Sequence, residues 1–207
     1  MTGAGPWTGD GDGQTPLTDE DAAGLVPTWI ATRADLYRAE QANILDAATW
    51  AARRRWTTAN LLAVDALVGL HRRMFDDVWT WAGQLRRHDT NIGQPWPAIR
   101  LLLTDLCADI VAQVADPADP ARPVMSMDEV AVRFHHRLTV IHPFANGNGR
   151  HGRLATDLLA RALGTPAFTW GLASLGSSGT TRDAYLAALR RADRALHYDD
   201  LLAFVRS

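Results

Sequence analysis

The 207-residue sequence contains no lysine, and all 21 of its basic residues are arginine. This absence excludes mechanisms that need a lysine side chain, such as a Walker-A phosphate loop, a Schiff base, a kinase-type strand lysine or a serine–lysine dyad. Any phosphate that the protein handles must therefore be bound by arginine and by backbone N–H groups. A genomic base bias explains arginine in place of lysine on the surface, but it does not explain where particular arginines lie.

Cysteine, long apolar runs and net charge are also scarce. Cys107 is the single cysteine, so no disulfide forms within the chain, and its apolar neighbours predict a buried helix residue. No run reaches the roughly 18 apolar residues of a membrane span. Residues 1–15 do not resemble a signal peptide, and their Gly and Asp content predicts a disordered tail. These features lead us to expect a cytoplasmic protein. The formal charge of −2 gives no indication of direct nucleic-acid or membrane binding.

Apolar residues at helical spacing recur along the chain and predict an all-α bundle that forms one domain over residues 16–207. The exception is the stretch 84–97, where Gly93, Pro95 and Pro97 predict a loop or a short hairpin. Periodicity and capping residues place the expected helices at about 28–55, 59–76, 98–116, 126–140, 148–163 and 180–196, with short helices near 19 and from 198.

The segment HPFANGNGRHGR, which begins at His142, carries the chemistry. Its small residues leave the backbone open and lead into a predicted helix N-terminus, an arrangement that binds anions. Gly147 and Gly149 allow an anion to approach the backbone closely. Arg150 and Arg153 lie three residues apart, so they can reach the same polyanion with bidentate contacts. A histidine facing this site would act as a general base, and the set predicts phosphoryl or nucleotidyl transfer.

The same segment resembles the signature of the Fic (Fic/Doc) family, HPFx(D/E)GN(G/K)RxxR. VWTWAGQLR at 78–86 is similar to the segment before the family's flap, and LHRRMF at 70–75 resembles the helix before it. The resemblance extends over roughly residues 20–200, and NGNGRH with an upstream EQANI looks most like the subgroup called mobile mystery protein B. Eight of the nine fixed motif positions match: His142, Pro143, Phe144, Gly147, Asn148, Gly149, Arg150 and Arg153.

The resemblance implies a Fic-type helical bundle with a short β-hairpin flap near residues 84–97. It also implies transfer of AMP from ATP to a Tyr, Thr or Ser hydroxyl of a target protein. The target would pair with the flap by β-augmentation, at Thr90, Asn91, Ile92 and Gly93. The implied roles in the motif are a general base for His142, a buried anchor for Phe144, a phosphate nest for Gly147, Asn148 and Gly149, and phosphate contacts for Arg150 and Arg153.

Asn146 is the departure from the family pattern. The family's acidic residue at this position binds Mg²⁺, and a neutral amide oxygen is a weaker ligand of the same kind. We expect retained but slow nucleotidyl transfer. Two alternatives stay open: a catalytically weak or inactive nucleotide-binding module, toxin-like and paired with an antitoxin or regulatory partner, or a Fic enzyme that transfers a phosphoryl group or UMP. Gly149 in place of lysine matches the AMP-transferring branch.

Glu40 is the nearest match to the inhibitory glutamate that many Fic proteins carry on a helix, here the helix expected over 28–55. The resemblance implies that this glutamate pairs with the second motif arginine, Arg153. Leu36 and Gln41 depart from the family's (S/T)xxxE(G/N) pattern. The alternative is a solvent-facing glutamate paired with a nearby arginine.

Two groups of arginines have plainer interpretations. Arg153 stands four residues before Asp157, a spacing that also fits a surface ion pair. The run Arg53–Arg55 is expected to be a solvated helix end, favourably placed against the negative end of the helix dipole.

Overall fold

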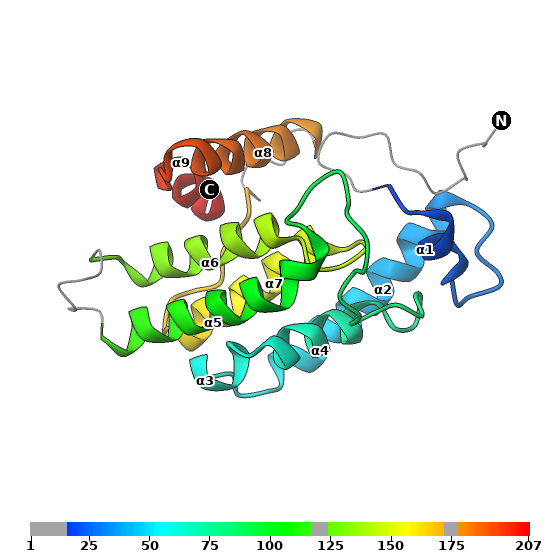
Figure 1. The fold of residues 1–207 in the computed structure, drawn as a ribbon, viewed down its shortest axis with the longest axis horizontal. Helices are drawn as coiled ribbons and strands as arrows, with labels where there is room; N and C mark the ends of the chain where they lie inside the picture. Colours follow the sequence, from blue (N-terminus) through cyan, green and yellow to red (C-terminus); the bar gives the residue numbers. More distant parts are fainter. Residues whose placement is uncertain (1–15, 117–123, 172–177) are drawn as a thin grey trace.

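The computed structural model describes residues 16–116, 124–171 and 178–207, and the tail expected over 1–15 lies outside them. The described residues form helices without strands, which confirms the all-α prediction (Figure 1). No helix among them is long and apolar enough to cross a membrane. The helices are α1 (Asp19–Ala23), α2 (Arg33–Ala52), α3 (Thr58–Leu61), α4 (Val64–Phe75), α5 (Ile99–Ala115), α6 (Met127–Ile141), α7 (Asn148–Ala162), α8 (Ser178–Ala195) and α9 (Asp199–Arg206), with a 3-10 turn at Trp96–Ala98.

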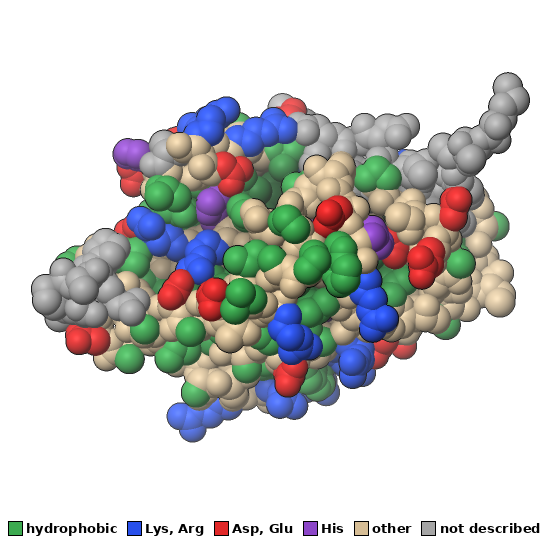
Figure 2. Space-filling view, in the orientation of Figure 1, with side chains coloured by type: hydrophobic (Ala, Val, Ile, Leu, Met, Phe, Trp, Pro, Cys, Tyr) green, Lys and Arg blue, Asp and Glu red, His purple; other side chains and the backbone are tan. Residues whose placement is uncertain are grey.

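Helices α6 and α7 form the centre of the bundle and pack along each other. Helix α5 covers α6, α4 contacts α7 and also packs against α2, and the pair α8–α9 lies against α6 (Figure 1). The core between them includes the fully buried rings of Phe75, Trp79, Phe134 and Phe144. Burial of each such side chain contributes roughly 1.5–3 kcal/mol before entropy is counted. Acidic and basic side chains are interspersed on the face in Figure 2, in keeping with the small net charge.

Two predicted helices have different bounds in the structure. The helix expected over 28–55 begins at Arg33, because Thr32 and Asp35 form a capping box at its N-terminus. The helix expected over 59–76 is two helices, since the chain leaves helical geometry at Leu62 and is extended at Ala63. Both Leu61 and Leu62 are buried at this break. The break therefore places two consecutive leucines in the core.

The β-hairpin predicted near 84–97 does not form, and this stretch is an irregular loop. Its backbone groups find other partners than a cross-strand ladder. The Arg86 N–H donates to the Pro143 carbonyl at 3.0 Å, and the Trp96 N–H donates to Asp89 Oδ1 at 2.8 Å. Pro95 and Pro97 have no N–H to offer. The loop is thus held by the segment after α6 and by its own side chains.

Candidate active site

The loop between α6 and α7 turns through two left-handed residues. His142, the last residue before the loop, has φ 53° and ψ 62°, and Gly147, at the start of α7, has φ 78°. A Cβ at Gly147 would lie 2.6 Å from the Phe75 ring, so only glycine fits there. The Asn148 side chain closes the loop, accepting from the Phe144 N–H at 2.9 Å and donating to the Phe144 carbonyl at 2.8 Å. The motif therefore specifies its own turn.

His71 of α4 packs against this loop and forms a hydrogen bond with it. Its ring stacks on the buried Phe144 ring with centroids 3.7 Å apart. Its Nδ1 accepts from the Gly83 N–H and its Nε2 meets the Asn146 carbonyl, both at 3.0 Å. Because an N–H occupies Nδ1, the ring is a neutral tautomer that donates from Nε2. Burial keeps the pKa of His71 well below 6.5. The histidine thus joins α4, the segment before the 84–97 loop and the motif loop.

Arg86 is the second support, and its guanidinium is buried. It donates to the carbonyls of His142 at 2.7 Å, His88 at 2.8 Å and Ile141 at 3.4 Å, and also to that of Gln94. These acceptors lie at the C-terminal end of α6, where the helix dipole favours a cation, and in the 84–97 loop. Arg86 therefore ties that loop to the backbone of His142.

The motif residues line a cavity of about 530 Å³ between α2, α7 and α8. The predicted flap residues Thr90, Asn91, Ile92 and Gly93 are not among its lining, although Gly93 lies close to His142: a Cβ on Gly93 would be 2.6 Å from the His142 Cβ. Phe144 lies beneath the loop and not in the cavity. The predicted residues that the cavity brings together are His142, Asn146, Gly147, Asn148, Gly149, Arg150, Arg153 and Glu40.

His142 is 9% exposed and faces this cavity. Burial lowers its pKa from 6.5 to about 4, and the positive charge of Arg86 acts in the same direction. The imidazole is therefore neutral at neutral pH, which is the form that accepts a proton.

Glu40 is buried in the wall of the same cavity, so the alternative interpretation, a solvent-facing glutamate, is wrong. Its Oε2 pairs with Arg150 Nη1 at 2.7 Å, and its Oε1 accepts from Trp79 Nε1 at 2.8 Å. The pairing implied by the family resemblance, with Arg153, is also wrong here: the carboxylate engages the first motif arginine. Trp79, which the sequence analysis did not single out, fixes the carboxylate in this orientation.

Arg153 lies against aromatic rings. Its guanidinium carbon is 4.8 Å from the Tyr185 ring centroid and 5.9 Å from that of Trp170. Its Nε is buried and has no hydrogen-bond partner among the described residues. Asp157 accepts instead from the Phe168 N–H and from Trp170 Nε1, at 3.1 and 3.0 Å, so the surface ion pair is not formed. Arg153 thus carries hydrogen-bonding capacity that an anion would satisfy.

The cavity does not offer the ligands that Mg²⁺ prefers. Asn146 Oδ1 accepts a hydrogen bond from the Gly147 N–H at 2.6 Å, and Glu40 is engaged by Arg150. Within the described part of the chain, no group of three or more His, Cys, Asp or Glu side chains is placed to hold a metal. Protein-bound Mg²⁺ is usually held by one or two carboxylates together with substrate phosphates. The residues present therefore do not fit a magnesium ion held by the protein itself.

The fold and the loop between α6 and α7 define a Fic domain, and residues 61–160 match the model of the Fic/DOC family. The chain belongs to this family. It is 28% identical over 148 residues to protein adenylyltransferase fic-1 of Caenorhabditis briggsae, which covers 70% of this chain and 26% of that protein. It is 32% identical over 97 residues to the probable protein adenylyltransferase y4lH of Sinorhizobium fredii (strain NBRC 101917 / NGR234), covering 46% and 50%.

Solved structures show the same fold. BepC of Bartonella tribocorum, determined with bound AMPPNP, matches with a TM-score of 0.64 at 16% identity, covering 91% of this chain and 97% of that one. The chain spans only a quarter to a half of the length of the two sequence relatives above.

Proposed function

We propose that this chain is a Fic-type protein adenylyltransferase, which transfers AMP from ATP to a Tyr, Thr or Ser hydroxyl of a target protein. The observation that carries the proposal is the shared cavity, where the neutral, buried His142 faces the N-terminus of α7 and two arginines. The names of the sequence relatives and the AMPPNP bound to BepC support the same activity.

The reaction follows from the roles of these groups. His142 takes the proton of the target hydroxyl, whose oxygen attacks the α-phosphorus of ATP. The bond between the α-phosphorus and the oxygen bridging to the β-phosphorus breaks, and pyrophosphate leaves with the electron pair. The backbone N–H groups from Gly147 to Gly149 hold the α- and β-phosphates, and the arginines offset the charge of the leaving group.

We further infer that Glu40 lowers the basal activity. Its carboxylate occupies Arg150, which the reaction needs for phosphate, and the Trp79 hydrogen bond keeps it there. Nucleotide must displace this ion pair before it can bind Arg150. A regulatory partner or an antitoxin that moves α2 would release Arg150.

The target protein is expected to dock on the 84–97 loop at Thr90, Asn91, Ile92 and Gly93. This loop lies against His142, since Gly93 approaches its Cβ closely. Docking there would bring a target hydroxyl toward the base. The assignment to the mobile mystery protein B subgroup stays a prediction.

The test is incubation of the full chain with Mg²⁺ and each nucleoside triphosphate in turn, followed by intact-mass analysis and transfer of label from α-labelled ATP. We expect addition of one AMP per modified hydroxyl, lost in His142→Ala and increased in Asn146→Asp, which restores a carboxylate ligand for nucleotide-bound Mg²⁺. Addition of phosphate or UMP instead would identify the alternative chemistry. Nucleotide binding without transfer by the wild type, Asn146→Asp and Glu40→Gly would indicate the inactive binding module.

A further inference from the structure

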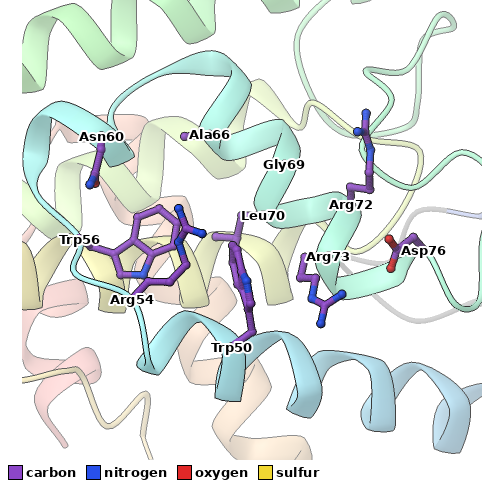
Figure 3. Close-up of a pocket in the computed structure, with 10 residues that line it drawn as sticks. All are labelled: Trp50, Arg54, Trp56, Asn60, Ala66, Gly69, Leu70, Arg72, Arg73 and Asp76. Atoms are coloured by element: carbon purple, nitrogen blue, oxygen red, sulfur yellow. The ribbon is translucent and has the colours of Figure 1, made fainter.

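A second cavity, of about 470 Å³, lies between the end of α2, α3 and α4 (Figure 3). It shares no lining residue with the active-site cavity. In Figure 3, Trp50 extends from α2 toward Leu70 of α4, with Arg54 and Trp56 on one side and Arg73 on the other. Its lining residues come from segments that the proposed reaction does not use.

The sequence WAARRRW, residues 50–56, forms a cation–aromatic stack in this cavity. The Arg54 guanidinium carbon lies 4.9 Å from the Trp50 ring centroid and 5.5 Å from that of Trp56. Arg73 lies 6.0 Å from the Trp50 ring. The Trp56 indole donates to the Ala51 carbonyl at 2.9 Å, which fixes its ring at the end of α2. The run Arg53–Arg55 is exposed, as expected, and Arg54 also forms part of a pocket wall.

The pocket is positively charged in a chain of nearly zero net charge. Arg54 and Arg73 form no ion pair with any residue of the described ranges, and Asp76 is the acidic residue of the lining. Arginine also keeps its charge at any physiological pH. The cations next to Trp50 are thus available to carboxylates of another molecule.

Gly69 keeps this pocket open. Glycine in the interior of a helix is destabilising, so an internal glycine usually has a packing reason. Here a Cβ on Gly69 would meet no atom within 4 Å. Packing within the chain therefore does not explain why this position is glycine. Any side chain here would, however, narrow the pocket that Gly69 lines.

We propose that this pocket, bounded by Trp50, Arg54, Trp56, Gly69 and Arg73, docks an acidic segment of a partner protein. An apolar side chain of the partner would lie on the tryptophan rings over Gly69, and flanking carboxylates would pair with Arg54 and Arg73. Tryptophan and arginine are the residue types that most often dominate the energetics of protein interfaces. The pocket walls are side chains of α2, α3 and α4 and of the turn at 53–57, without the glycine loop and helix N-terminus that suit phosphate in the first cavity.

The test is binding of a fluorescein-labelled peptide, one leucine flanked by glutamates on both sides, to the full chain by fluorescence anisotropy. We expect saturable binding that weakens about tenfold or more in Gly69→Leu and in the double variant Arg54→Glu/Arg73→Glu. A Cβ at position 69 meets no atom within 4 Å, and leucine favours a helix more than glycine does, so the thermal midpoint of Gly69→Leu should not fall. The matched control Arg100→Glu/Arg194→Glu makes the same charge change at exposed positions outside both cavities and should change Kd less than about twofold.

Several outcomes would overturn the proposal. They are no binding to the wild type, equal affinity for a peptide with glutamine in place of glutamate, or binding that Gly69→Leu does not weaken. Displacement of the peptide by AMP or inorganic phosphate from the wild type and from Arg153→Ala alike would show that the pocket prefers a small phosphate ligand. Because the readout is binding and Arg153→Ala should bind the peptide normally, failure of AMP transfer leaves this test unaffected.

Discussion

The two cavities described above are built from different parts of the chain. One wall of the first cavity is the backbone of the loop between α6 and α7, which buried groups hold in place: His71 and Arg86 bind carbonyls there, and left-handed residues turn the loop. The second cavity is formed by side chains of α2, α3 and α4 and of the turn at 53–57, where one hydrogen bond holds Trp56. Substitutions of the residues that hold the first cavity in place should therefore lower the free energy of unfolding and the transfer activity together. Substitutions in the second should change binding and leave the fold intact.

Acid should have the largest effect, and it should act on α6 and α7, the helices on either side of the motif loop, where His135 and His151 are fully buried. Burial lowers the pKa of His142 and His151 to about 4 and that of His135 to about 3, against 6.5 in the unfolded chain. The unfolded chain thus binds more protons below pH 6.5, so stability that is complete above this pH is lost as the pH falls toward 4. Through each histidine, the free energy of unfolding should fall by roughly 2 kcal/mol by about pH 5. Urea unfolding at about pH 7 and pH 5 measures this, and equal free energies would contradict it.

Arg86→Met should be the most damaging single substitution outside the motif. It leaves the carbonyls that Arg86 binds, among them that of His142, buried without their donor. We expect a loss of about 3–5 kcal/mol in unfolding free energy and a loss of transfer activity in the protein that remains folded. Arg54→Met, an equal change in the second cavity, should alter stability by less than about 1 kcal/mol. Chemical denaturation of both variants gives the comparison, and similar losses would remove the distinction between the two regions.

A substitution of Glu40 should show whether its carboxylate inhibits AMP transfer or only stabilises the first cavity. Glu40→Gln keeps an oxygen for the Trp79 indole and removes the charge that pairs with Arg150. We expect a rise in AMP transfer of roughly tenfold, equivalent to about 1.4 kcal/mol, and a lower KM for ATP. Asp46→Asn, at an exposed position of the same helix outside the cavity, is the control. Steady-state kinetics with unchanged or reduced activity in Glu40→Gln would refute the inhibitory role.

Gly69→Ala should give the smallest effect. The added methyl group meets no atom within 4 Å and replaces glycine in a helix interior. A gain of about 0.5–1 kcal/mol in unfolding free energy follows from helix propensity. Thermal unfolding measures it, and destabilisation would show that the space above Gly69 is already occupied by the chain.

The sequence predicted the features that neighbouring residues determine, and it did not predict the contacts between residues far apart in the chain. Helical periodicity predicted the bundle, and the motif from His142 to Arg153 predicted the loop because its glycines and asparagine specify their own turn. Glu40 and Arg150 stand 110 residues apart, and Arg86 and His142 stand 56 apart, so no spacing rule joins them. The hairpin prediction failed for a related reason, because the distant carbonyls of Ile141 and Pro143 bind N–H groups of the 84–97 loop.

The central claim is that His142 is the base for AMP transfer in the first cavity. The most direct measurement compares label transfer from α-labelled ATP by Glu40→Gly and by Glu40→Gly/His142→Ala, with ATP affinity measured for both. We expect the loss of His142 to lower the rate about a hundredfold to ten-thousandfold at nearly unchanged ATP affinity. Equal transfer by the two variants would contradict it.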